Sequence, residues 1–355
     1  MTVDVEAGTS STDGRTAVAA RVADMRRRSR RRTGVVACTL VAITLGVFWA
    51  TMTVGEPDIE TNRILQAMIG RGRGLANFVI FEDRLPRALV AILAGGLLAV
   101  SGTMYQQVIR NPLATPDILG VSAGAAAGAA VSMVLIPGSA LGVSGSALVG
   151  ALIVFAILST TVLGTDGSTY RLILVGIGVS GLAASITAYA LMQARGASLL
   201  AARRWTSGST NSSTWSDVEM LGGLALAVAV AVIVLARGLG ALRYGDDVAV
   251  GLGAHAARTR IGALLVGAVS VALTTSIVGP IGFIALVSGP IAQRLAPRGP
   301  QLGLSVLVGA SLVLTSDLIA QYAPGLSPLP VGIISSLVGA PILVALLLGG
   351  RRASS

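Results

Sequence analysis

Few side chains within the long apolar stretches of this sequence could do chemistry. Asp317, in LVLTSDLIAQYA, is the one carboxylate that lies plainly inside such a stretch. An acid within a membrane is costly and is by default a functional candidate, for example in a proton relay. Thr315 and Ser316 could instead hydrogen-bond it, and the sequence favours this structural role. No nucleophile–base pair, metal-ligand cluster or second buried carboxylate accompanies it to build an active site.

Two arginines flank a proline at the start of an apolar helix that we expect over about 88–104. These residues are Arg84 and Arg87, in R-L-P-R. A guanidinium group binds a carboxylate through two parallel hydrogen bonds, so this pair could receive acidic side chains of another protein. Both could equally be ordinary arginines at the end of a membrane helix.

A polar bend follows this helix, in the segment R-N-P-L-A-T-P-D at 110–117. Pro112 and Pro116 lack an N–H group and bias the preceding residue away from helix, so the bend should be tight and fixed. A helix of small residues should begin at about Ile118. Small residues on both flanks allow close helix packing within a membrane. A rigid polar corner between two such helices is typical of the wall or gate of a pathway.

The composition defines the class of protein. Of 355 residues, 53% are hydrophobic and 12% charged, and the mean hydropathy is +0.80. Soluble domains carry about 25% charged residues, so this chain should cross a membrane several times. All 26 basic residues are arginine, which excludes a P-loop lysine and a Schiff base. These arginines flank apolar segments, which is typical of membrane topology rather than of a nucleic-acid interface.

Apolar runs of spanning length predict an all-α membrane protein with about ten transmembrane helices, although the eighth run is short and could be a partial span. The predicted ranges are 34–54, 85–107, 118–136, 142–163, 171–192, 219–237, 259–278, 281–293, 302–322 and 331–349. Residues 1–33 are polar, and we expect them to form a disordered tail. Its arginine cluster at 26–32 should hold the N-terminus in the cytoplasm. An even number of spans then places both termini there.

One cytoplasmic loop is longer than a connection requires. Residues 238–258 mix helix-forming residues with paired glycines. They predict two short helices around Gly251-Leu252-Gly253, too polar to span a membrane. A structured loop of this kind is typical of a docking element for another protein, and the alternative is a flexible connector.

Several motifs resemble those of FecCD-type permeases, the membrane subunits of ABC importers for ferric siderophores, haem and vitamin B12. The first set is R-L-P-R, S-G-x-x-x-Q and R-N-P-L-A-x-P-x-x-L-G, within residues 84–120. Further matches are R-W-T-S-G-S at 204–209 with Trp215, the loop 245–260, V-G-P-I-G-F-I-A-L at 278–286, and P-L-P-V-G at 328–332. The resemblance covers about 34–352, which would form one permease domain.

The resemblance implies a vitamin B12 permease-like fold of a type II ABC importer. It also implies a second permease subunit, an ABC ATPase dimer and a siderophore-binding protein outside the cytoplasmic membrane of a bacterium. ATP and Mg would be bound by the ATPase, so this chain would need no cofactor and would not be an enzyme. Haem or vitamin B12 are alternative substrates. An ion-coupled secondary transporter or a structural scaffold are alternative classes.

The resemblance also assigns roles to individual residues by their position. Arg84 and Arg87 match arginines that face outward and pair with carboxylates of the binding protein. Asn111 and Leu113 match the cytoplasmic gate. The positions that match the ATPase-coupling region are Val250, Gly251, Leu252, Gly253 and Ala254.

One segment and two single positions depart from the usual family pattern. The segment S-G-P-I-A-Q-R at 288–294 stands where relatives usually have A-P-H or A-P-Q and then I-A-R. Gln321 replaces a frequent arginine, and Pro328 replaces a frequent glutamate. These departures, with the T-P-D-I-L-G sequence, are similar to the second, ferric-enterobactin-type subunit of a heterodimer.

Overall fold

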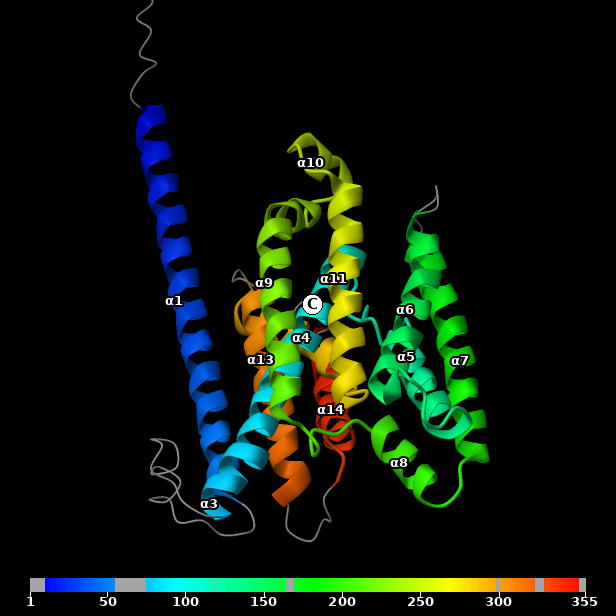
Figure 1. Cartoon of the computed structure of the whole chain (residues 1–355). Helices are drawn as coiled ribbons and strands as arrows, with labels where there is room; N and C mark the ends of the chain where they lie inside the picture. The colour runs from blue at the N-terminus through cyan, green and yellow to red at the C-terminus, as the bar shows by residue number, and fades with distance from the viewer. Residues whose placement is uncertain are drawn as a thin grey trace, which may run out of the picture.

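The computed structural model describes residues 10–54, 75–117, 119–163, 169–297, 301–322 and 329–350. Within these residues the regular structure is entirely helical (Figure 1). The helices are α1 (Ser10–Thr53), α3 (Leu75–Phe78), α4 (Leu85–Ile109), α5 (Val121–Ala130), α6 (Gly142–Leu163), α7 (Thr169–Gln193), α8 (Ala197–Thr206), α9 (Trp215–Leu242), α10 (Asp246–Gly251), α11 (Ala256–Val278), α12 (Ile284–Leu295), α13 (Gln301–Tyr322) and α14 (Val331–Gly350). The π-helical segment Val79–Arg84 joins α3 to α4, and Val131–Leu135 extends α5.

The predicted all-α membrane fold is confirmed. In the part of the chain that the structure describes, seven helices are long and apolar enough to cross a membrane. Two shorter apolar helices, Val121–Leu135 and Val331–Leu346, and the 12-residue α12 account for the other three predicted spans. Each of the ten ranges therefore corresponds to a helix, and the chain is a multi-pass membrane protein.

Helix α4 is the centre of the bundle. In its most apolar stretch 83% of the residues are buried, against 17–22% in α6, α7 and α9. Helices α9, α11, α12 and α13 all pack on it. Gly95 of α4 faces Gly309 of α13 so closely that a Cβ on either would collide with the backbone of the other. Small residues thus allow the close approach that packs helices within a membrane.

The two ends of the bundle carry different elements, and we name them after α8 and α10. Figure 1 shows α3 and α8 at one end and α10 at the other. Helix α4 starts at the α8 end, with Pro86 in its first turn, where a missing N–H costs nothing. Helix α9 also starts there, and the N–H of Thr214 donates to Asp217 Oδ2 at 2.8 Å, which caps the helix.

Within the tail that we expected to be disordered, residues 10–33 are instead helical, because α1 is continuous from Ser10 to Thr53, and residues 1–9 lie outside the described residues. Alanine and arginine form helix readily, and an apolar helix that is already formed extends at little cost. Asp24 and Arg28 form an ion pair at 2.9 Å one turn apart. Arg32 Nε donates to the carbonyl oxygen of Leu295 at 2.8 Å and so caps the end of α12.

Candidate functional site

Charged side chains meet inside the bundle near the α8 end. Asp317 of α13 is completely buried, and its Oδ1 accepts hydrogen bonds from Arg87 Nε at 3.2 Å and Nη2 at 2.9 Å. The Thr210 hydroxyl donates to the same oxygen. Arg84 Nη1 donates to the carbonyl oxygen of Met52 at 2.6 Å. The intramembrane acid is therefore paired with an arginine, as such groups usually are.

These contacts differ from what the sequence suggested. Arg84 and Arg87 were expected to face outward, but their side chains are 2% and 6% exposed and bind inside the chain. Asp317 is held by Arg87 and Thr210, not by Thr315 or Ser316. The pairing had one signal in the sequence. Arg87 follows the start of one predicted span and Asp317 precedes the end of another, which places both at similar depth.

Three motifs that are far apart in the sequence meet beside this network. The N–H of Ser209 donates to the carbonyl oxygen of Val278 at 2.8 Å, and the N–H of Gly332 donates to Gly208 at 3.2 Å. Gly208 and Gly279 have φ angles of 71° and 73°, which favour glycine. A Cβ on Gly332 would collide with the carbonyl oxygen of Ser207. The segments 204–209, 278–286 and 329–332 thus form one tightly packed junction.

The predicted bend lies at the α10 end. Helix α4 ends at Ile109, and the next residue, Arg110, turns the chain with a φ of 54°. Arg110 Nη2 donates to the carbonyl oxygen of Leu242 at 3.0 Å. The N–H of Leu113 donates to Asn111 Oδ1 at 2.9 Å, which closes an Asx turn. Leu113 is 38% exposed. The bend is therefore fixed by its own hydrogen bonds as well as by its prolines.

The last residue of the bend is an acid, Asp117. Burial raises the pKa of the Asp117 carboxyl, and a hydrogen bond from the Ser122 hydroxyl acts in the opposite direction. The serine lies in the first turn of α5, so this contact ties the bend to the next helix.

The loop between α9 and α11 forms one short helix, α10, rather than the two that the sequence suggested. Residues 238–242 continue α9, and α11 begins at Ala256, because both segments extend apolar spans. Gly245 and Gly253, with φ angles of 113° and 77°, turn the chain on either side of α10. Val250 and Leu252 are 64% and 68% exposed, so this end presents an apolar surface.

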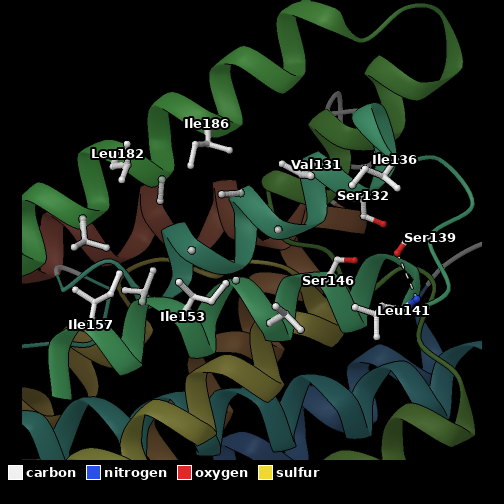
Figure 2. Close-up of a pocket in the computed structure, with 18 residues that line it drawn as sticks. Val131, Ser132, Ile136, Ser139, Leu141, Ser146, Ile153, Ile157, Leu182 and Ile186 are labelled. Atoms are coloured by element: carbon white, nitrogen blue, oxygen red, sulfur yellow. Dashed lines mark hydrogen bonds between the residues drawn. The ribbon is translucent and has the colours of Figure 1, made fainter. Parts of the chain in front are cut away.

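An apolar groove of about 320 Å³ lies between α5, α6 and α7. Ile153 and Ile157 of α6 and Leu182 and Ile186 of α7 line it (Figure 2). Helix α7 beside it also exposes small residues, among them Gly178 and Gly181. An exposed helix face of this composition permits close packing of another membrane helix.

The described residues include no group of three His, Cys, Asp or Glu side chains that could hold a metal ion.

Comparisons with known proteins agree with this architecture. The chain is 34% identical to the ferric enterobactin transport system permease protein FepG of Escherichia coli over 322 residues, 90% of this chain and 97% of the relative. It is 33% identical to the achromobactin transport system permease protein CbrC of Dickeya dadantii over 317 residues, 87% and 90% of the two chains. A metal-chelate type ABC transporter solved in an inward-facing conformation has the same fold, with a TM-score of 0.77 and 24% identity over 89% of this chain and 99% of that chain.

The family model of the FecCD transport family matches residues 40–349. This range begins within α1 and ends within α14, so it takes in the buried network, the junction, the bend and the α10 loop. The chain belongs to the FecCD transport family.

Proposed function

We propose that this chain is the permease subunit of an ABC importer that carries ferric siderophores across the cytoplasmic membrane of a bacterium. The observation that carries the proposal is its similarity, over about nine-tenths of its length, to permeases named for ferric enterobactin and achromobactin. A permease named for Fe(3+) dicitrate, FecD of Escherichia coli, is 34% identical over 77% of this chain. In this proposal a separate ATPase supplies the energy.

The α10 end faces the cytoplasm and the α8 end faces outward. The arginines at 26–32 support this orientation, because they lie on α1 directly before its apolar residues 34–53, and arginine-rich flanks stay in the cytoplasm. The α10 end then meets the ATPase, and the α8 end meets the binding protein.

The apolar surface at α10 docks the ATPase. Val250 and Leu252 are exposed on a loop outside the spans, where an apolar side chain gains from contact with another protein. Gly251, Gly253 and Ala254 form the turn that presents them. The N–H of Ala254 donates to the carbonyl oxygen of Ala249 at 2.9 Å, so this turn is ordered and can transmit a push from the ATPase.

The bend at Asn111 and Leu113 serves as the cytoplasmic gate. Its backbone is fixed by the Asx turn, and the exposed Leu113 side chain projects from it. A rigid gate moves as one body with α4 and α5, so the inward opening closes or opens without local unfolding. Movement of the surrounding helices then closes the outward opening as the inward opening forms, and the reverse.

The exposed arginines on α8 and just before it receive the binding protein. The resemblance assigned that role to Arg84 and Arg87, but both are occupied by partners inside the chain. Arg195, Arg203 and Arg204 are exposed at the same end. Their guanidinium groups can bind carboxylates of a docked protein.

A second permease subunit packs against the exposed face of α7. The small residues on that face and the adjoining apolar groove of Figure 2 support this contact. The sequence departures at Gln321 and Pro328 favour a partner that is similar but not identical, so the pore is a heterodimer.

Affinity purification of the tagged chain in mild detergent, with mass spectrometry of the recovered proteins, tests the assembly. We expect an ABC ATPase and a second, non-identical permease. Recovery of the ATPase with copies of this chain alone would contradict the heterodimer. Uptake of ⁵⁵Fe-labelled siderophores by vesicles that hold the complex tests the substrate. A chain that purifies alone and transports without ATP would overturn the proposal.

A further inference from the structure

A crevice of about 380 Å³ lies between α1 and the chain that follows α12. Helix α1 stands at the edge of the bundle in Figure 1, and 22% of its most apolar stretch is buried. The α1 wall of the crevice directly precedes the apolar residues 34–53. The residues that line the crevice include Arg28, Ser29, Arg32, Thr33, Ala296 and Pro297.

The α1 wall carries two positive charges and several hydrogen-bond donors. Arg28 and Arg32 lie one helical turn apart, and none of the described residues that line the crevice is acidic. The hydroxyl groups of Ser29 and Thr33 line it beside them. Arg32 Nε donates to the carbonyl oxygen of Leu295 at 2.8 Å, which holds this side chain at the crevice. A guanidinium group has five N–H donors, so Arg32 keeps donors for a phosphate group.

An acid outside the crevice competes for one of these arginines. Asp24 Oδ2 lies 2.9 Å from Arg28 Nε, and the two side chains are 55% and 82% exposed. An exposed ion pair of this kind contributes little stability. Arg28 can therefore exchange this carboxylate for a phosphate group, which arginine binds through two parallel hydrogen bonds.

The crevice lies at the level of the lipid headgroups. At about 1.5 Å per residue, Arg32 and Arg28 lie about 3 Å and about 9 Å before Gly34, where the apolar run begins. The headgroup layer is about 5–8 Å thick on each side of a bilayer. Long arginine side chains extend to reach it. Basic pockets between membrane helices on the cytoplasmic side are typical sites for anionic lipid headgroups.

An apolar surface continues the crevice toward the membrane interior. Ala296 lines the crevice and also belongs to an apolar cluster with Leu40 of α1. On the open side, Val35 follows Arg28 and Arg32 at the spacing of one helix face and is 60% exposed. A phospholipid matches a basic mouth beside an apolar wall, whereas a free phosphate uses the mouth alone.

We propose that this crevice binds the headgroup of an anionic phospholipid of the cytoplasmic leaflet. Arg28 and Arg32 bind the phosphate oxygens. Ser29 and Thr33 hydrogen-bond the headgroup, and the acyl chains lie along the exposed face of α1. The inference goes beyond transport and uses only the proposed orientation of the α10 end toward the cytoplasm. A bound lipid bridges α1 and the end of α12, and so adds to the contact that Arg32 makes there.

Native mass spectrometry of the assembled permease complex in detergent tests the site. Phosphatidylglycerol and phosphatidylcholine with the same acyl chains are titrated separately, and the dissociation constant of each lipid adduct is measured. We expect phosphatidylglycerol to bind at least about tenfold more tightly, since each arginine near an anionic headgroup contributes about fivefold. Added salt should reduce this difference, because ions screen exposed charges.

Three variants of α1 separate the crevice from general charge. Arg28→Gln should weaken phosphatidylglycerol binding about fivefold. It removes one exposed ion pair, so folding is preserved. Asp24→Asn removes the competing acid and should tighten binding about threefold. Arg30→Gln is the matched control, because it removes an exposed arginine from the opposite face of the same helix, outside the crevice. It should change binding by less than about twofold, because solvent and salt screen that charge from the crevice.

Four results would overturn the assignment. The first is equal affinity for the two lipids. The second is an equal loss in Arg28→Gln and Arg30→Gln, which would show attraction by net charge alone. The third is displacement of phosphatidylglycerol by an equal concentration of inorganic phosphate, which would identify a site for a free anion. The fourth is unchanged lipid binding with lower ATPase recovery in Arg28→Gln, which would assign this arginine to a protein contact.

Discussion

Arg87 and Asp317 form a buried ion pair, with 2.9 Å between Arg87 Nη2 and Asp317 Oδ1, across 230 positions of the sequence. It joins α4 to α13 near the α8 end. The same carboxylate accepts a hydrogen bond from Thr210, which precedes α9. One acid therefore connects three segments, and each of them would lose a contact if the charge were removed.

Replacing Asp317 by Asn should destabilise the fold, because it leaves Arg87 buried without its counter-charge. The expected loss is about 3–5 kcal/mol, measured as a lower unfolding temperature in detergent. Glu219→Gln, which changes an exposed acid at the same end, is the matched control and should have no effect. Arg87→Met combined with Asp317→Leu should recover part of the stability. A stable Asp317→Asn variant that has lost uptake would instead indicate ion coupling.

Gly309→Ala should disrupt a close contact between α4 and α13. Its Cβ would collide with the carbonyl oxygen of Gly95 and with the Cβ of Ala99, so the two helices would have to move apart. Overpacking of this kind costs about 1–3 kcal/mol. Gly303→Ala lies on the same helix with nothing within 4 Å of the added Cβ. The control should be neutral or slightly stabilising, since alanine favours helix. Equal unfolding temperatures for the two variants would show that the helices can separate freely.

Asn111→Ala should loosen the bend, because the Leu113 N–H loses its acceptor. The expected cost is about 1 kcal/mol. Asn111→Asp keeps an oxygen at this position and should retain the turn. If the bend is the gate, Asn111→Ala complexes should hydrolyse ATP but transport less iron per ATP. The gate assignment fails if the ratio of iron transported to ATP hydrolysed equals that of the wild type.

Leu252→Asp should prevent capture of the ATPase. A charge at the centre of an apolar contact removes burial energy and adds desolvation cost, so recovery of the ATPase in pull-down should fall at least about tenfold. Leu200→Asp is the control, because Leu200 is similarly exposed, at 61%, on α8 at the opposite end. Undiminished ATPase recovery with Leu252→Asp would place the docking surface elsewhere.

The helices could be predicted from the sequence because apolar runs of spanning length leave few alternatives in a membrane. The bend could be predicted equally well, since a proline restricts the backbone of its own neighbours. The packing of the helices against one another could not be predicted in this way. Arg84 and Arg87 look like exposed helix-end residues, and only the placement of α13 and of the end of α1 shows that both are enclosed. The helical state of residues 10–33 was missed because a polar, arginine-rich composition is shared by disordered tails and exposed helices.

The enclosure of α4 has a consequence for how the protein responds to its membrane. Changes in bilayer thickness act on helices that contact lipid, through hydrophobic mismatch. In α6, α7 and α9 most side chains face away from the protein interior, whereas α4 is 83% buried in its most apolar stretch. A thinner or thicker bilayer would therefore tilt the perimeter while α4 keeps its position. Lipid composition should alter the rate at which the lipid-facing helices α6, α7 and α9 move, and it should leave the position of α4 unchanged.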